Sequence, residues 1–206
     1  MARAVRRAVI VGTVVRLQVQ RSRLKPGPPT TRVYDPAPLL EVEALEVGPL
    51  GCVGLLGADR VLDVHHADHE DTRNRGGNGL SLLPTSAYDN LQSRYGAHLA
   101  TGIVGESVLL DVPGEWPGGD LLLETDHEPL LLSQVVPAAP CVEFSRFCLG
   151  IPPGPVGDDV KQALIDLDGG SRGYYARVTG SGTVRIGAHL TSTFLTSRTS
   201  ASTSHA

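Results

Sequence analysis

Glycine and proline recur along the whole chain and limit the length of any regular element that it can form. The 206 residues include 24 glycines and 15 prolines, and only 4% of the residues are aromatic. Glycine favours turns and proline lacks a backbone N–H group, so neither residue sustains a long helix. The composition therefore predicts many short strands joined by tight turns, and it argues against a helical bundle.

Length and charge define the broad class. A chain of 206 residues fits one ordinary domain with a full hydrophobic core. Its formal net charge of −4 gives no general attraction to nucleic acid or to anionic membranes. We therefore expect neither as a partner, and we expect any phosphate binding to be local.

The N-terminal segment has some features of a secretion signal. Arginines precede the apolar run AVIVGTVV, but this run is short and Arg16 follows it without a clear cleavage site. We interpret it as a first strand, over residues 9–19. Cys52, Cys141 and Cys148 are an odd number without an export signal, so we expect reduced thiols in a cytoplasmic protein.

Alternating polar and apolar residues predict further strands, and two segments have helical spacing. One helix is expected directly after Pro84, and a second after Asp158 or Asp159. A hairpin is expected in YYARVTGSGTVRIG. The further strands are expected at residues 39–47, 60–65, 104–112, 121–125 and 130–136. This pattern predicts a mainly β protein with some α structure, a barrel or sandwich with a few peripheral helices.

The last residues differ in composition from the rest. The segment TSTFLTSRTSASTSHA is too polar and too small to pack into a core. We therefore expect a single domain over residues 1–190 and a disordered tail over residues 191–206.

The densest polar stretch, residues 63–79, reads DVHHADHEDTRNRGGNG. His65 and His69 lie four residues apart, as two ligands on one helix face would, with His66, Asp63 and Asp68 beside them. The segment has no helical periodicity, however, and does not match the zinc-protease motif. Two interpretations stay open, a metal site and a polar surface loop in which one histidine orients a backbone carbonyl.

The second half of this stretch suggests anion binding. Arg73 and Arg75 flank the turn Gly76-Gly77-Asn78-Gly79. Glycines allow successive N–H groups to form an anion-binding concavity, and arginines add charge-assisted hydrogen bonds. The turn matches neither the P-loop nor the GxGxxG pattern. It suits a phosphate-like group, and the alternative is an ordinary turn between strands with solvated arginines.

A carboxylate and a hydroxyl, Glu106 and Ser107, follow a glycine turn at the start of an expected strand. Glu106 could accept hydrogen bonds from N–H groups of a ligand, or it could hold neighbouring loop amides. Serine-hydrolase chemistry is poorly supported, because the chain has no GxSxG elbow around these residues.

Cys141 directly follows a proline, in AAPCVEFSRFC. A thiolate is a nucleophile and a soft-metal ligand, and it needs positive charge or hydrogen-bond donors nearby. Arg146 or an arginine from another loop could supply that charge. The alternative is a strand over residues 141–148 whose thiols face the core and are inert.

Taken in order, these motifs resemble the MOSC domain, a family named after the C-terminal part of molybdenum cofactor sulfurase. The resemblance extends from about residue 12 to residue 190 and implies a mostly β barrel. Ser107 stands where the family usually has asparagine, and Ala188-His189 stands where Gly-Asp is common. The motifs that carry the resemblance are RNRGGNGLSLLPTSAYDNLQSRYGAHLATGIVGES, the pair Pro140-Cys141, and GSRGYYARVTGSGTVRIGAHL.

The resemblance also implies a function. Cys141 would carry a persulfide sulfur in a sulfurtransferase, or it would ligate molybdenum in an enzyme that reduces N-hydroxylated compounds. The implied cofactor is the molybdenum cofactor, and the implied partners are a sulfur donor or an electron-transfer protein. Pyridoxal phosphate is not expected on this domain alone. The residues that would bind the cofactor or its anionic group are Arg73, Arg75, Gly76, Gly77, Asn78, Glu106 and Ser107. Arg172, in the turn before the expected hairpin, is a further candidate for the anion, and the alternative is a solvated turn arginine.

Two functions of other classes stay open at the level of sequence. One is a non-enzymatic module that binds a phosphorylated ligand, with Cys141 inert. The other is a metal-dependent hydrolase that uses His65, His66 and His69.

Overall fold

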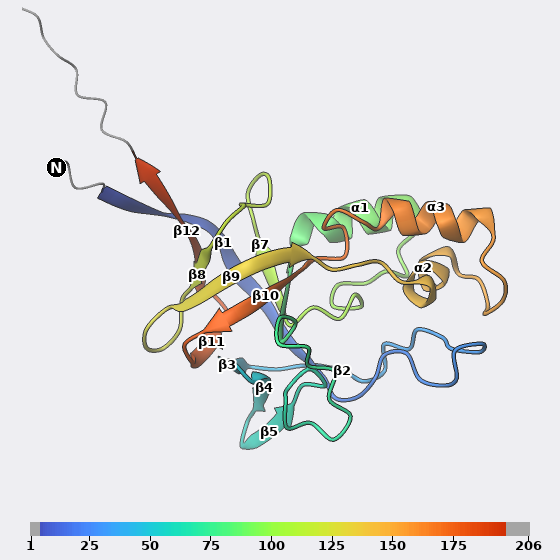
Figure 1. Ribbon diagram of the computed structural model, residues 1–206, viewed down its shortest axis with the longest axis horizontal. Helices are drawn as coiled ribbons and strands as arrows, with labels where there is room; N and C mark the ends of the chain where they lie inside the picture. Colours follow the sequence, from blue (N-terminus) through green and yellow to red (C-terminus); the bar gives the residue numbers. More distant parts are fainter. Residues whose placement is uncertain (1–4, 197–206) are drawn as a thin grey trace, which may run out of the picture.

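The computed structural model describes residues 5–196 and shows a β-barrel with helices at one end and a smaller sheet at the other (Figure 1). Its helices are α1 (Thr85–Tyr95), α2 (Val142–Leu149) and α3 (Asp158–Asp166). The strands of the barrel are β1 (Val5–Gln20), β6 (Leu80–Pro84), β7 (Val108–Asp111), β8 (Leu121–Leu123), β9 (Leu130–Pro137), β10 (Tyr174–Thr179) and β12 (His189–Thr196).

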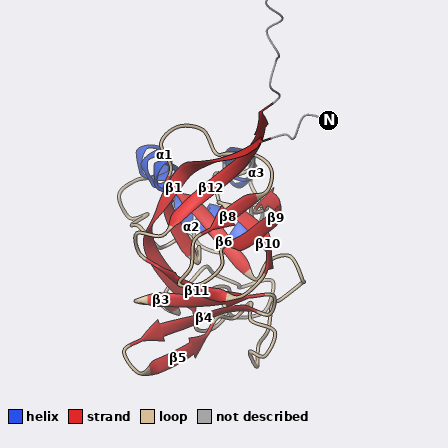
Figure 2. Ribbon diagram, turned by 90° about the vertical axis from the view of Figure 1, so that its left-hand side faces the viewer, coloured by secondary structure: helices blue, strands red, loops and turns tan. Residues whose placement is uncertain are grey.

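These seven strands form a closed ring in the order β12-β8-β9-β10-β6-β7-β1, and β1 closes it by pairing with β12. All neighbours are antiparallel except β6 and β7, which are parallel. Outside the ring, a short strand pairs with the end of β1, and a four-stranded sheet has the order β11-β3-β4-β5 (Figure 2). These outer strands are β2 (Leu39–Glu41), β3 (Ala44–Gly48), β4 (Gly51–Leu56), β5 (Asp59–Leu62) and β11 (Gly182–Arg185). The prediction of a mainly β barrel with peripheral helices is confirmed.

Aliphatic side chains fill the barrel. Strand β9 shows the expected alternation, because Leu130 and Leu132 are fully buried whereas Leu131 is 36% exposed. Burying one such leucine contributes about 1.5–3 kcal/mol. A second apolar cluster lies under the helices and includes Tyr88 of α1 and Phe144 of α2. Cys141 packs against this second cluster.

The expected hairpin of residues 174–186 does not form. β10 pairs with β6 and β9 in the barrel, whereas β11 pairs with β3 in the smaller sheet. Asp126, in the turn between β8 and β9, binds β11. The N–H group of Thr183 donates to Asp126 Oδ1 at 2.9 Å, and the N–H group of Asp126 donates to the Thr183 carbonyl at 3.1 Å. The turn at Gly180 therefore moves the chain from one sheet to the other.

The strand interpretation of residues 141–148 is wrong, because residues 142–149 form helix α2. Phe144 and Cys148 are four residues apart and share the buried face of this helix. Gly150 ends the helix in the left-handed conformation, with φ of 64°. In the part of the chain that the structure describes, no helix is both long and apolar enough to cross a bilayer.

Strand β12 extends further than the sequence predicts. It runs to Thr196 and pairs with β1 from Val5 onward, so residues 191–196 of the expected tail belong to the barrel. Ladder hydrogen bonds come from the backbone, and small polar side chains therefore do not prevent this pairing. The rest of the expected tail, residues 197–206, lies outside the described residues.

Gly173 precedes β10 at a position where a side chain does not fit. Its φ is +84°, and a Cβ atom built there would lie 2.3 Å from the Leu82 carbonyl oxygen. We expect Gly173→Ala to lower the free energy of unfolding by about 3 kcal/mol, because the left-handed conformation costs about 1–2 kcal/mol and the forced backbone shift adds about 1–3 kcal/mol. Urea unfolding of both proteins measures the loss.

Gly187→Ala is the matched control for this substitution. Gly187 has a similar φ of +89°, but no heavy atom lies within 4 Å of a built Cβ atom. We expect only the conformational cost there, about 1–2 kcal/mol. Equal losses at the two positions would show that the contact with Leu82 is unimportant.

Candidate functional site

Cys141 lies where extended backbone enters α2, with φ of −135° and ψ of 151°. Its sulfur accepts a hydrogen bond from Nη1 of Arg172 at 3.3 Å. Arg172 lies just before β10, and the N–H group of Ala138 donates to the Gly173 carbonyl at 2.9 Å, so the pairing of β9 and β10 brings the two segments together. A guanidinium and the free N–H groups of a helix start are the neighbours that a sulfur anion needs.

Arg172, and not Arg146, therefore supplies the positive charge beside Cys141. Its guanidinium carbon lies 4.1 Å from the centroid of the Phe144 ring, in a cation–π contact. Its Nη2 donates to the Val104 carbonyl at 3.4 Å. Its Nε is buried and has no hydrogen-bond partner within the described residues. Unpaired buried donors are rare, and this one could be satisfied by a bound anion or water.

The loop before β7 is held from inside by a tyrosine and a glutamate. The hydroxyl of Tyr88, on α1, donates to both carboxylate oxygens of Glu106 at 2.9 Å. The same hydroxyl accepts the N–H groups of Gly102 at 2.7 Å and Val104 at 3.3 Å. Glu106, which is only 3% exposed, thus acts on the loop amides through Tyr88. Of the two roles that the sequence left open for Glu106, ligand binding and holding neighbouring loop amides, this arrangement corresponds to the second.

Burial changes the acidity of this glutamate. Loss of water around the carboxylate raises the pKa of Glu106 to about 7, although hydrogen bonds from Tyr88 and the loop act in the opposite direction. The carboxyl is therefore close to half-ionised at neutral pH.

Tyr34 joins this loop to α2. Its hydroxyl donates to the carbonyls of Ile103 at 2.6 Å and Val104 at 3.0 Å. Its ring lies 4.9 Å from the Phe144 ring and 5.1 Å from the Phe147 ring, centroid to centroid. Burial raises the pKa of Tyr34, so the hydroxyl stays protonated and donates.

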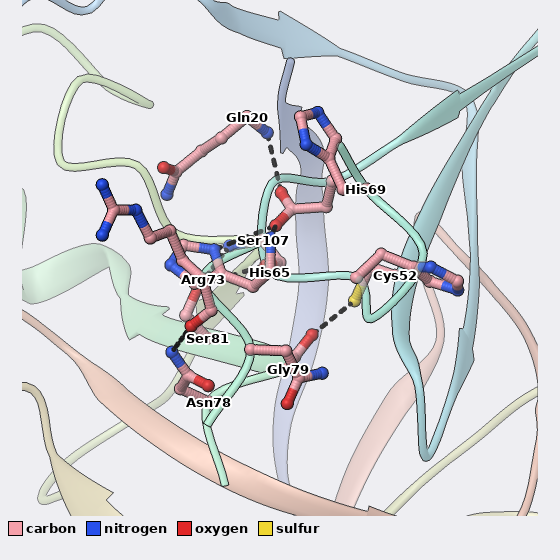
Figure 3. A network of polar contacts seen from close by, with 12 residues as sticks. Gln20, Cys52, His65, His69, Arg73, Asn78, Gly79, Ser81 and Ser107 are labelled. Atoms are coloured by element: carbon pink, nitrogen blue, oxygen red, sulfur yellow. Dashed lines mark hydrogen bonds and ion pairs between the residues drawn. The ribbon is translucent and has the colours of Figure 1, made fainter. Parts of the chain in front are cut away.

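Ser107 faces the start of β6 and not α2. Its hydroxyl lies 3.1 Å from that of Ser81, and its side chain is buried. Nearby, the Cys52 thiol donates to the Gly79 carbonyl at 3.1 Å (Figure 3). Burial raises the pKa of Cys52 well above its usual value. Ser107 and Cys52 therefore support the segment that contains the glycine-rich turn.

Hydrogen bonds within the glycine-rich segment occupy two backbone N–H groups, one of them in the turn that the sequence assigned to an anion. The N–H groups of Arg75 and Gly76 donate to the side-chain oxygens of Asn78 and Asn74, at 2.7 Å each. The Asn78 amide donates back to the Arg73 carbonyl at 2.9 Å (Figure 3). Within residues 5–196, the guanidinium groups of Arg73 and Arg75 make no hydrogen bond and no ion pair. The two arginine side chains, and not the N–H groups of Arg75 and Gly76, are therefore available to bind an anion at this turn.

The histidine stretch forms successive turns, as the polar-loop interpretation predicts. His65 Nδ1 lies 3.0 Å from Asp63 Oδ1, and His69 Nε2 lies 3.1 Å from the Arg21 carbonyl. His66 Nδ1 accepts the N–H group of Asp68 at 3.2 Å. Each ring thus contacts the protein, and no group of three potential ligands for a metal ion converges among the described residues.

Gln20, at the end of β1, connects the histidine stretch to the loop before β7. Its N–H group donates to Asp63 Oδ2 at 2.7 Å, and its side-chain amide donates to the Gly105 carbonyl at 2.8 Å. The structure thus assembles Cys141, Arg172 and the loop that contains Glu106, with the Arg73 turn connected through Gln20. The sequence did not identify Tyr34 or Gln20, and it placed Tyr88 only within the helix expected after Pro84.

Comparisons with known proteins support the fold. No protein-family model matches this chain, and a sequence comparison with curated proteins finds no match. The solved structure of the YuaD protein from Bacillus subtilis is 11% identical, with a TM-score of 0.57, over 91% of this chain and 97% of that chain. A structure described as a hypothetical protein is 16% identical, with a TM-score of 0.52, over 91% of this chain and 67% of the other. The structure of YiiM from Geobacillus stearothermophilus is 17% identical, with a TM-score of 0.47, over 93% of this chain and 76% of that chain. The first two show that this fold occurs in other proteins.

The raised pKa of Glu106 predicts a pH-dependent stability. A carboxyl whose pKa is higher in the folded state favours folding when it is protonated, and this contribution is lost as the pH rises from about 4.5 to about 7. We expect the wild type to lose roughly 2.5 kcal/mol relative to Glu106→Gln between pH 5 and pH 8. Urea unfolding at the two pH values measures this difference. Parallel pH profiles for the two proteins would show that Glu106 titrates normally.

Proposed function

We propose that this chain is a MOSC-type domain in which the sulfur of Cys141 is the functional atom and carries a persulfide. The observation that supports this most is the 3.3 Å contact between that sulfur and the Arg172 guanidinium at the start of α2. The closed barrel agrees with the fold that the sequence motifs imply. The sulfur-carrier role needs only a thiol and a neighbouring cation, and both are present.

The chemistry follows from these two side chains. The Cys141 thiol loses its proton to solvent, and the thiolate attacks the outer sulfur of a persulfide on a donor protein. A sulfur–sulfur bond forms at Cys141 while the donor's sulfur–sulfur bond breaks, and the donor leaves as a thiolate. Arg172 stabilises the sulfur anion before and after the transfer.

The other two cysteines differ from Cys141 in their environment. Burial raises the pKa of Cys148 to about 12, and the Cys148 side chain is 1% exposed. Cys52 is fully buried as well. Both stay neutral thiols, so the transfer is specific to Cys141.

Ligation of the molybdenum cofactor by Cys141 is the second candidate. It is favoured by the guanidinium groups of Arg73 and Arg75, which have no partner among residues 5–196. Together with the unpaired Nε of Arg172, these groups fit an anionic cofactor. Cys141 would hold the metal, and Arg73 and Arg75 would hold the phosphate. The bound cofactor would supply a redox centre for N-hydroxylated substrates. Glu106 and Ser107 would support the loop, because both are buried and hydrogen-bonded within the protein.

Each candidate requires a different partner. Sulfur transfer needs a donor protein that carries a persulfide, and reduction needs an electron-transfer protein. We propose that the protein performs either reaction in the cytoplasm.

Intact-mass analysis and molybdenum quantification distinguish the candidates. We expect protein purified from a cofactor-producing host to carry one additional sulfur atom, and Cys141→Ser to lack it. Cys148→Ser is the matched control and should keep the additional sulfur, because Cys148 is buried. Molybdenum that is lost only in Cys141→Ser would favour the second candidate. A protein without either signal would support the module that binds a phosphorylated ligand with an inert Cys141.

The role of Arg172 predicts slower chemistry at Cys141 when its charge is removed. We expect Arg172→Gln to slow alkylation of Cys141 by iodoacetamide roughly tenfold at pH 7, because the sulfur anion loses its cation. Peptide mapping by mass spectrometry follows the reaction at each cysteine separately. Arg146→Gln is the control, because Arg146 donates to the Gly154 carbonyl and not to Cys141. An unchanged rate in Arg172→Gln would contradict the assignment.

A further inference from the structure

A pocket of about 310 Å³ lies along α2 and is separate from the contact between Cys141 and Arg172. Helix residues 143, 146 and 147 line it, whereas Phe144 and Cys148, on another face, pack into the apolar cluster under the helices. The segment 150–153 and the loop that contains Tyr34 complete the walls. The size is that of a site for a small molecule.

The walls of the pocket are largely apolar and partly flat. The rings of Tyr34 and Phe147 lie 5.1 Å apart with an interplanar angle of 53°. Ile151, Pro152 and Pro153 follow the end of α2 and form another part of the lining. Aromatic and proline surfaces of this kind favour a ligand with a flat apolar body.

A buried arginine gives the pocket its charge. Arg146 is only 9% exposed, and its guanidinium donates to the Gly154 carbonyl. No carboxylate oxygen of the described residues lies within ion-pair distance of it. Glu143, which also lines the pocket, is paired instead with Arg32, at 3.9 Å. A buried charge without a counter-ion is costly, and an anionic ligand would compensate it.

We propose that this pocket binds a small aromatic carboxylate. The carboxylate accepts hydrogen bonds from the Arg146 guanidinium, and the ring packs against Tyr34, Phe147 and the proline segment. Arginine and carboxylate form a planar pair with two hydrogen bonds, a geometry that a neutral amide does not match. The proposal does not depend on sulfur transfer, because Cys141 does not line the pocket.

Titration of the full chain with simple probes tests this proposal. We expect benzoate to shift the amide NMR signals of residues 143–151. Benzamide, which has no charge, loses the charge-assisted bonds to Arg146, and acetate, which has no ring, loses the apolar contacts. Each should therefore bind at least tenfold more weakly than benzoate. Equal binding of benzoate and benzamide, no binding of benzoate, or signal changes elsewhere would overturn the proposal. Tighter binding of phenyl phosphate than of benzoate would overturn the assignment to a carboxylate.

Variants separate the role of Arg146 from that of the neighbouring charge. Arg146→Gln should weaken benzoate binding at least tenfold, whereas the double variant Arg32→Gln/Glu143→Gln, which removes both members of the neighbouring ion pair in the pocket wall, should weaken it by less than roughly threefold. Cys141→Ser should bind benzoate as the wild type does, which keeps this test independent of the sulfur chemistry. Comparable losses in the Arg146 variant and the double variant would contradict the assignment.

Replacing Arg146 also removes its hydrogen bond to the Gly154 carbonyl. A second variant therefore keeps Arg146 and changes another residue of the pocket wall. Ile151 is 41% exposed and lines the same pocket. Ile151→Asp should weaken benzoate binding through like-charge repulsion while leaving thermal stability nearly unchanged. Unchanged benzoate affinity in this variant would place the ligand outside the pocket.

Discussion

The pairing of β1 with three other strands is the constraint on which both the barrel and the candidate site depend. The first half of β1 pairs with β12 and closes the barrel, and its second half pairs with β7 and β2. At that end, two glutamine side chains donate to the loop before β7. Gln18 donates to the Gly102 carbonyl and Gln20 to the Gly105 carbonyl, each at 2.8 Å. The strand that closes the barrel thus also fixes the loop behind Arg172.

Each backbone N–H and carbonyl group of this loop from Gly102 to Gly105 has a hydrogen-bond partner, which makes this segment a rigid support. Tyr88 binds its N–H groups, and the glutamines of β1 and Tyr34 bind its carbonyls. The Val104 carbonyl accepts from both Tyr34 and Arg172. A side chain that rests on such a support keeps its position without further ordering when it acts. The geometry beside Cys141 is therefore set by residues that do not themselves contact the sulfur.

The sequence predicted the elements that local patterns determine. The alternation in Leu130–Leu132 and the helix expected after Pro84 were predicted correctly, because burial of one face follows from spacing. The hairpin prediction was wrong because β11 pairs with β3 and bonds to Asp126, and the local turn pattern at Gly180 does not reveal these distant partners. Cys141 and Arg172 could be identified as candidates, but their contact could not, since it spans 31 residues. Tyr34 lies in a loop whose local sequence has no signal, and its partners are 69 and 70 residues away.

Helix α2 separates two positively charged environments within eight residues. Arg172 lies over the ring of Phe144 on one face, and Arg146 lies beside Phe147 on another. A short helix can hold both because each guanidinium is bound by a carbonyl from outside the helix, that of Val104 or of Gly154. Tyr34 contacts both rings. The two environments therefore differ in their chemistry but share one aromatic wall, so their geometry is set together by the packing of Tyr34 against α2.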